Sequence, residues 1–294
     1  MLDDLHQIDR PLQLDGASVP AVRPGQLGDL TFLRDHGLRF AYLAGAMANG
    51  IGSTDIVAAM ANAGLLGFFG AAGLGLDRVE QAIDRVQASV PELPHGFNLI
   101  HSPHEPRLEA GCVELYLRRG VRLVEASAFL DLTLPVVRYR TAGLHAAGGR
   151  IVAPNRVIAK VSRVEVATRF FSPPPEKMLA ELVRQGQLTD EQALLAKRIP
   201  VAQDVTAEAD SGGHTDNRPP ITLLPTLLKR DRLQEQYRHE THLYVGAAGG
   251  IATPVAVAAA FQMKRRLRAD RFDQPGVPRV GVVRRGAGDA RRRR

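Results

Sequence analysis

Seven short apolar runs, separated mostly by helical patterns, constrain the fold of this 294-residue chain more than any other feature. We predict β-strands at 40–46, 65–71, 96–100, 121–126, 157–161, 199–205 and 242–247. Strands that alternate with helices form a parallel sheet through right-handed crossovers, either doubly wound or closed as an eight-stranded barrel. In both architectures, ligands bind at the carboxyl ends of the strands.

Polar and glycine-rich segments follow these predicted strands. They are 46–50, Asn98, Ser127, 160–162, 208–214 and 249–250. Lys160 ends an apolar strand, where an ammonium group without a partner would be expensive to bury. We therefore interpret Lys160 as a contact to a phosphate or a flavin, with a charge on the rim of the sheet as the alternative.

Two pairs of glycines stand where backbone could approach a ligand closely. Gly249 and Gly250 precede a predicted helix, so they either present N–H groups to a phosphate or only form a tight turn. Gly212 and Gly213 precede His214, whose imidazole exchanges protons near neutral pH. An ordinary turn with a surface histidine is the alternative there. Neither spacing is that of a Rossmann or P-loop motif.

The positive charge of the chain is concentrated in its last residues. Residues 264–294 contain 12 Lys+Arg and 3 Asp+Glu, whereas residues 1–263 contain 26 and 28. The main body is therefore slightly acidic and offers no basic groove for nucleic acid.

A single cysteine excludes an internal disulfide and favours a reducing compartment. No apolar signal segment follows Met1, so we expect a cytoplasmic protein. Residues 56–76 are uncharged, but their glycines predict a helix followed by a buried strand rather than a membrane span. His95, His101 and His104 lack the spacing of a zinc-binding helix, so we expect a pocket-lining or surface loop and no metal.

The same patterns suggest three segments. Residues 1–29 form a polar leader, residues 30–263 the barrel, and residues 264–294 a basic tail. Within the barrel, residues 163–200 contain a run of prolines and further helical patterns. We interpret this stretch as a helical insertion that serves as a lid or as a surface for a partner.

Six motifs resemble the FMN-dependent enoyl reductases of the PfaD type, within the nitronate monooxygenase (2-nitropropane dioxygenase) group. They are AGAMANG at 44–50, GFNLIHSP at 96–103, DLTLPVVRYR at 131–140, VIAKVSRVE at 157–165, AEADSGGHTDNRP at 207–219 and GAAGGIATP at 246–254. The resemblance implies a TIM (β/α)8-type barrel that binds FMN at the carboxyl ends of its strands.

The resemblance also implies a role for each matching residue. Ala46, Met47 and Ala48 would lie against the flavin ring, and Asn98 and Lys160 would contact the cofactor. Gly212 and Gly213 would pass close to it, Gly249 and Gly250 would hold half of the phosphate, and His214 would be the catalytic acid or base.

The function implied is an oxidoreductase that reduces enoyl intermediates bound to acyl carrier protein, in trans, during polyunsaturated fatty acid or polyketide synthesis. NADPH or NADH would donate the electrons, and the synthase would be the partner; a homo-oligomer is also possible. The alternatives are a nitronate monooxygenase, an inactive truncated fragment, or a binding protein that uses its basic tail.

The resemblance stops after Met263. Suitable codons for residues 265–279, read one nucleotide downstream, encode a sequence similar to the eighth strand of the family and its phosphate loop. We therefore expect that the tail is translated out of frame and that the eighth strand is missing or corrupted. A barrel with open edges and half a phosphate site would bind FMN weakly and be poorly soluble.

Overall fold

The computed structural model describes residues 12–14, 17–19, 23–211, 215–229, 231–251 and 253–266. Its centre is a parallel seven-stranded sheet with the order β11-β10-β9-β6-β5-β4-β3. The strands are β3 (Leu43–Ala44), β4 (Leu66–Phe69), β5 (Gly96–Ile100), β6 (Leu123–Ser127), β9 (Arg156–Val161), β10 (Asp204–Glu208) and β11 (Tyr244–Ala248). Neighbouring strands follow one another along the chain, as in a (β/α) barrel.

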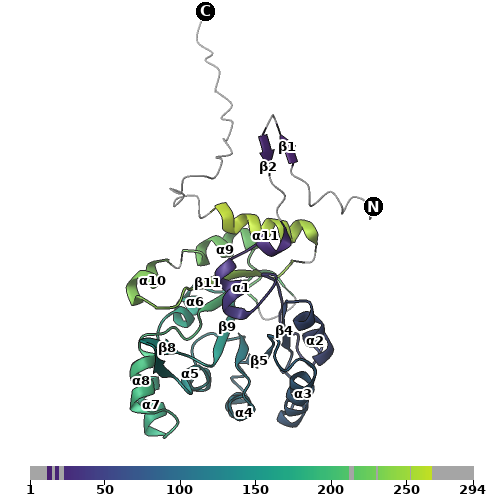
Figure 1. The fold of residues 1–294 in the computed structure, drawn as a ribbon. Helices are drawn as coiled ribbons and strands as arrows, with labels where there is room; N and C mark the ends of the chain where they lie inside the picture. Colours follow the sequence, from purple (N-terminus) through teal and green to yellow (C-terminus); the bar gives the residue numbers. More distant parts are fainter. Residues whose placement is uncertain are drawn as a thin grey trace, which may run out of the picture.

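The sheet curls but stays open between β3 and β11, the two edge strands of the described residues (Figure 1). Four helices lie on its outer side: α2 (Thr54–Asn62), α3 (Leu76–Ser89), α4 (Pro106–Arg118) and α5 (Leu134–Thr141). The predicted barrel-type α/β fold is confirmed. Within the described ranges no eighth strand joins the sheet, and residues 267–294 lie outside them.

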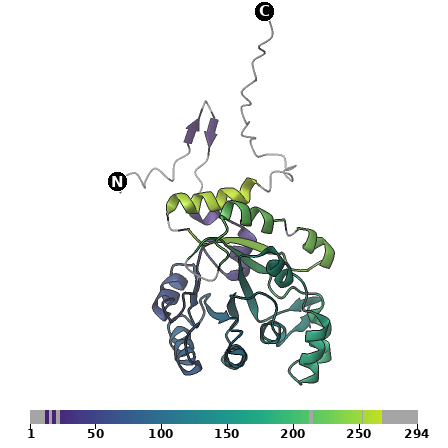
Figure 2. The ribbon, with the colours of Figure 1, turned by 180° about the vertical axis from the view of Figure 1, so that it is seen from behind.

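Two helices from the carboxyl-terminal part of the barrel segment, α9 (Pro220–Leu227) and α11 (Pro254–Arg266), lie across the curled sheet from α2 to α4 (Figures 1 and 2). Helix α9 packs in the same outer core as those helices, through Leu223, Leu224 and Leu227. A Cβ atom on Gly28 would lie 3.3 Å from Phe261, so α11 reaches the segment before α1 (Leu30–His36). Helix α11 therefore spans the gap between the edge strands.

Helix α1 is held against the amino ends of the last two strands. His36 Nε2 lies 3.1 Å from Asp204 Oδ2, and the Tyr244 hydroxyl donates to Asp35 Oδ2 at 2.8 Å. Leu33 packs with Phe68 and Ile158 inside the curl of the sheet. This helix, which the strand pattern did not predict, thus plugs the amino-terminal end of the barrel.

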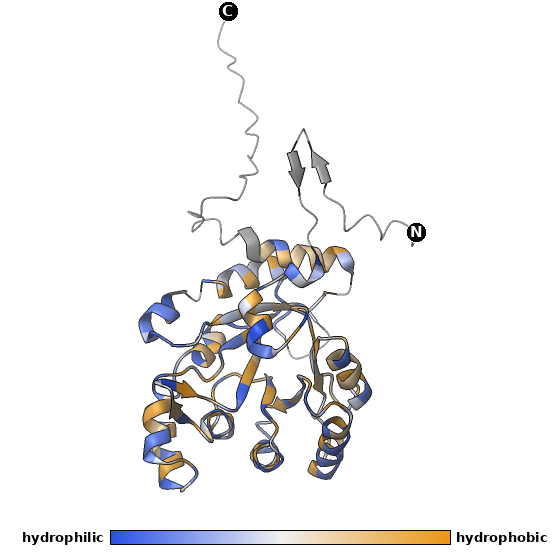
Figure 3. Ribbon diagram, in the orientation of Figure 1, coloured by the Kyte–Doolittle hydropathy of each residue, from blue (hydrophilic) through white to orange (hydrophobic). Residues whose placement is uncertain are grey.

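Side-chain alternation divides each strand between the two faces of the sheet. In β9, Val157, Ala159 and Val161 pack in the core beneath the outer helices, whereas Ile158 packs with the inner cluster and Lys160 lines the central cavity. The outer helices are amphipathic: α3 buries one apolar face, formed by Val79, Ala82, Ile83 and Val86. Figure 3 shows both hydrophilic and hydrophobic residues on these helices.

The predicted insertion contains α6 (Val164–Phe171), α7 (Glu176–Arg184) and α8 (Asp190–Ala196). Helix α6 packs on β9 and β10, while α7 and α8 pack against α5 on the outside of the molecule. Helix α8 also contacts an antiparallel hairpin, β7 (His145–Ala147) and β8 (Arg150–Val152), that was not predicted. None of residues 163–200, all of which the structure describes, lines the cavity described below, so the geometry does not support the lid interpretation.

One predicted strand boundary was wrong, and two further segments contain elements that the strand pattern did not predict. The apolar run 199–202 is buried, but its backbone is irregular and the strand begins only at Asp204. Residues 220–237 form two helices, α9 and α10 (Asp231–Tyr237), instead of one continuous helix. The leader contains a short hairpin of β1 (Leu12–Leu14) and β2 (Ala17–Val19), followed by the 3-10 helix η2 (Pro24–Gln26).

The uncharged stretch 56–76 forms α2 and β4, as predicted from its glycines. Across the part of the chain that the structure describes, none of the helices is both long enough and apolar enough to cross a bilayer.

Candidate functional site

A cavity of about 910 Å³ opens at the carboxyl ends of the strands. This volume is within the range of small-molecule and cofactor sites. Every predicted cofactor-contacting residue in the described ranges lines it: Ala46, Met47, Ala48, Asn98, Lys160, Gly249 and Gly250. Gly212, Gly213 and His214 lie outside the described residues, and their predicted roles remain predictions.

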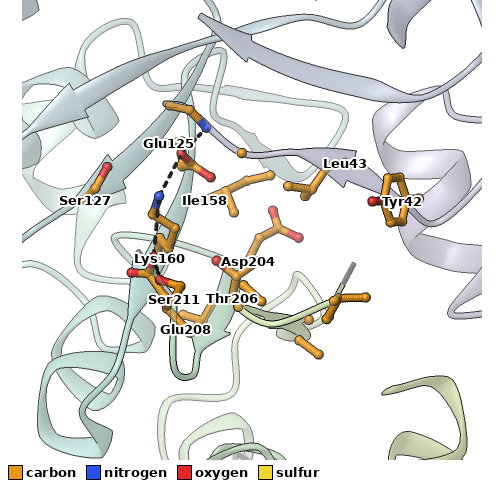
Figure 4. Close-up of a pocket in the computed structure, with 18 of the residues that line it drawn as sticks. Tyr42, Leu43, Glu125, Ser127, Ile158, Lys160, Asp204, Thr206, Glu208 and Ser211 are labelled. Carbon is orange, nitrogen blue, oxygen red and sulfur yellow. Dashed lines mark hydrogen bonds and ion pairs between the residues drawn. The ribbon is translucent and has the colours of Figure 1, made fainter. Parts of the chain in front are cut away.

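Lys160 lies between two carboxylates in this cavity (Figure 4). Its Nζ atom is 3.6 Å from Glu125 Oε2 and 3.7 Å from Glu208 Oε1. The Lys160 side chain is 17% exposed, and those of Glu125 and Glu208 are 1% and 9% exposed. The three residues come from β9, β6 and β10, at positions that alternation directs into the barrel.

Glu125 also fixes the loop that follows β3. Its Oε2 atom accepts a hydrogen bond of 2.8 Å from the backbone N–H of Ala46. Its Oε1 atom is buried and has no hydrogen-bond partner. Burial raises the pKa of this carboxyl, while the Lys160 ammonium and the Ala46 N–H act in the opposite direction. A Cβ atom at Gly45 would stand 3.0 Å from Oε1, so the carboxylate and the loop are in close contact.

Asn98 is oriented by a hydrogen-bond network on β5 and β6. Its Nδ2 atom donates to the Glu125 carbonyl at 3.0 Å and to the Ser127 hydroxyl. The buried Tyr116 hydroxyl donates to the Asn98 carbonyl at 2.6 Å, which holds the backbone as well. Both side-chain bonds use Nδ2, so Oδ1 is the atom of the amide left to accept from a ligand.

The glycine turn after β11 borders the same cavity. Gly249 and Gly250 have φ angles of 84° and 67°, in the left-handed region that glycine adopts most easily. A Cβ atom on Gly249 would lie 2.9 Å from the Ala209 carbonyl oxygen. Thr253 Oγ1 then accepts from the Ala256 N–H at 3.2 Å, as a cap of the 13-residue helix α11. The tight turn and the helix N-terminus thus occur together, so the two interpretations of this motif do not exclude each other.

Sequence reasoning missed several polar residues of the cavity, three of which lie on its central strands. Glu125 stands at the centre of the buried strand β6, and Asp204 and Thr206 point into the cavity from β10 (Figure 4). The Thr206 hydroxyl is buried without a partner, as is Asp204 Oδ1. A charged residue inside an otherwise apolar strand was the available signal, because both faces of a parallel strand are normally apolar.

The three histidines near β5 do not line the cavity. His101 Nδ1 lies 2.9 Å from Glu109 Oε2 and its ring stacks on Phe129. His95 contacts the Leu93 carbonyl at 2.9 Å. His104 borders a second pocket, between the loop before α3 and the start of α4, so this segment lies outside the central cavity and is in part a pocket-lining loop.

A family model described as Nitronate monooxygenase matches residues 36–263. One polyunsaturated fatty acid synthase polypeptide of Thraustochytrium sp. is 46% identical over 282 residues, which are 88% of this chain and 19% of that protein. The polyketide biosynthesis protein PksE of Bacillus subtilis is 43% identical over 240 residues, which are 81% of this chain and 31% of that protein. The chain thus spans less than a third of these curated relatives.

Among solved structures, the enoyl reductase domain of MlnA from the macrolactin biosynthesis cluster of Bacillus amyloliquefaciens superposes with a TM-score of 0.79 at 39% identity. The match covers 82% of this chain and 55% of that one. The resemblance recognised from the sequence motifs is confirmed by these relatives. With its barrel-type sheet and a family match over 36–263, this chain belongs to the nitronate monooxygenase family.

Proposed function

We propose that this chain is the flavin-binding part of an FMN-dependent enoyl reductase. The observation that carries the proposal is the convergence of the predicted cofactor residues from β3, β5, β9 and β11 on one cavity. The relatives named for fatty acid and polyketide synthesis, and the enoyl reductase domain of MlnA, support reduction over other chemistry.

The cavity fits FMN in three respects. It has the volume of a cofactor site, and its inner wall carries buried polar atoms without partners, Glu125 Oε1 and Thr206 Oγ1. Its rim carries a glycine turn that leads into a helix N-terminus, which suits a phosphate. Ala46, Met47 and Ala48 would lie against the ring, and Asn98 and Lys160 would bond its polar edge. Gly249 and Gly250 would hold half of the phosphate.

When bound, the flavin would supply hydride transfer from NADPH or NADH to the β-carbon of an enoyl group. The protein residues would orient the flavin and the enoyl group and would deliver the proton that the α-carbon takes up. Lys160 would donate hydrogen bonds to the flavin from its position between two carboxylates. His214 is proposed as the acid that protonates the α-carbon, since an imidazole exchanges protons near neutral pH.

The substrate proposed is an enoyl group carried on acyl carrier protein. Met47 and Ile51 border the cavity and are 43% and 63% exposed, so the entrance offers apolar contacts to an acyl chain. The synthase that carries this acyl chain would be the partner, and the cytoplasm the location. A second copy of the chain remains a possible partner.

A nitronate monooxygenase is the second candidate, because the family model that matches bears that name. Here His214 would act as the base in oxidation of a nitronate. Consumption of NADPH with an enoyl thioester, compared with oxygen uptake with a nitronate, separates the two reactions. Enoyl-dependent NADPH consumption is expected, whereas nitronate-dependent oxygen uptake alone would contradict the reductase.

An inactive fragment is the third candidate, and the open edges of β3 and β11 favour it. Titration of the purified chain with FMN distinguishes this candidate from both enzymes. Saturable quenching of flavin fluorescence is expected, and its absence would support the fragment.

A further inference from the structure

The cavity is unusually acidic for a site proposed to bind an anion. Of the described residues that line it, four are acidic and one is basic: Asp29, Glu125, Asp204 and Glu208, with Lys160. Asp29 caps α1 by accepting from the Thr31 N–H, and Asp204 is bonded to His36. The remaining pair, Glu125 and Glu208, flanks the ammonium of Lys160.

In the trio of Glu125, Lys160 and Glu208, the ammonium lies at nearly the same distance from both carboxylates. Both Nζ–Oε distances, 3.6 and 3.7 Å, exceed the usual 2.7–3.2 Å of a direct N–H···O bond. The ammonium therefore lies between the two carboxylates and forms a short hydrogen bond with neither. Lys160 therefore keeps N–H donors for a ligand in the cavity. Its positive charge is more than offset, because two carboxylates face one ammonium.

Each carboxylate is itself held by a second contact. Glu125 accepts from the Ala46 N–H, and Glu208 Oε1 accepts from the Ser211 hydroxyl at 3.2 Å. The trio therefore connects the loop after β3 with the loop after β10 across the mouth of the barrel. A network that is buried and anchored at both ends places its charges at defined points in a medium of low dielectric constant.

We propose that Glu125 and Glu208 are positioning residues that hold Lys160 toward the flavin and lower the reduction potential of the flavin. The inference rests on the proposed function. Reduction adds electrons to the cofactor, so nearby positive charge favours the reduced form and nearby negative charge opposes it. A cofactor whose reduction is less favourable passes its hydride on to an acceptor more readily, which suits a reductase.

The test measures the reduction potential of bound FMN in the full chain, by equilibration with a reference dye, together with FMN affinity by fluorescence quenching. Glu125→Gln and Glu208→Gln remove charge but keep an oxygen for the Ala46 and Ser211 donors. Both are expected to shift the potential upward, and Lys160→Gln is expected to shift it downward. Glu92→Gln, an exposed residue at the opposite end of β5, is the matched control and should leave it unchanged.

A double-mutant cycle distinguishes action through Lys160 from a simple sum of charges. If Glu125 also holds Lys160 toward the flavin, its loss lets the ammonium withdraw and offsets part of the upward shift, so the upward shift of Glu125→Gln is larger in the Lys160→Gln background. Additive shifts overturn the inference but leave the proposed function standing. An unchanged potential in both glutamine variants does the same, provided that both still bind FMN. Failure of the unaltered chain to bind FMN overturns the proposed function and the inference with it. Should Glu125→Gln not fold, the opposite shifts of Glu208→Gln and Lys160→Gln decide the result.

Discussion

Replacing Gly249 with alanine tests the glycine turn that is proposed to hold the flavin phosphate. The substitution imposes two costs. A φ of 84° places an L-residue in the left-handed region, which costs about 1–2 kcal/mol. The new Cβ would also stand 2.9 Å from the Ala209 carbonyl oxygen and 3.0 Å from that of Asp210. Both neighbours are backbone atoms, so relief requires a backbone shift, at roughly 1–3 kcal/mol by analogy with overpacking.

Gly186→Ala supplies the matched control, because Gly186 has a φ of 68° and no atom within 4 Å of its virtual Cβ. Urea unfolding of both variants should show about 1–2 kcal/mol of destabilisation for Gly186→Ala and about 2–5 kcal/mol for Gly249→Ala. A shift of the turn should also weaken FMN binding by about tenfold or more, since 1.4 kcal/mol is a factor of ten. Equal destabilisation of the two variants, with unchanged FMN affinity, would refute the steric argument.

Single side chains supply three further predictions. Burial raises the pKa of Glu125 in the folded state, so the folded protein binds this proton more tightly than the unfolded chain does. The free energy of unfolding should therefore fall as pH rises from the pKa of the unfolded chain, about 4.3, through the raised pKa of the folded state. Glu125→Gln should remove that part of the pH dependence in urea titrations, and an unchanged profile would contradict the assignment. His214→Ala should keep FMN but lose enoyl-dependent turnover, and unchanged turnover would eliminate the proposed role. Tyr116→Phe leaves the buried Asn98 carbonyl without its donor and should cost about 1–3 kcal/mol in thermal or urea unfolding; a neutral effect would show that another donor replaces the hydroxyl.

Much of the strand and helix pattern was predictable because the strands are short, apolar and bounded by breakers. The strand at 96–100 lies between a proline segment and a polar loop, and the structure has it at Gly96–Ile100. Ser53 stands directly before α2 and caps it by accepting from the Ile56 N–H, as serine commonly does at a helix start. The parallel sheet followed from the alternation of strands and helices, and its barrel order from the family resemblance. In a parallel sheet the polar carboxyl ends of the strands meet at one edge, where they surround the cavity.

The errors have a common physical origin, which is that burial alone does not specify backbone conformation. Residues 199–202 are apolar because they pack under α6, where Val201 and Ala202 donate to the Ser172 and Phe170 carbonyls instead of joining the sheet. The hydrophobic pattern of such a segment is the same as that of a strand. Its conformation depends on contacts made far away in the sequence.

The buried charges were the least predictable part of the site. Lys160 was singled out as an isolated lysine, but its two carboxylate partners come from strands that lie 35 residues before it and 48 residues after it in the sequence. Glu125 sits in a strand whose neighbouring positions, Val124 and Ala126, face the helices. Only the register of the parallel sheet, which pairs Glu125 with Ile158 and Thr206 with Lys160, shows that these groups share one interior.

The most direct test of this account is a parallel titration of the purified full chain with FMN and with riboflavin, followed by flavin fluorescence. The account predicts saturable binding of one FMN per chain, weaker binding of riboflavin because the glycine turn and the start of α11 have no phosphate to hold, and a loss of the difference in Gly249→Ala. Absence of saturable FMN binding, or equal affinity for the two flavins, would contradict the assignment of the cavity.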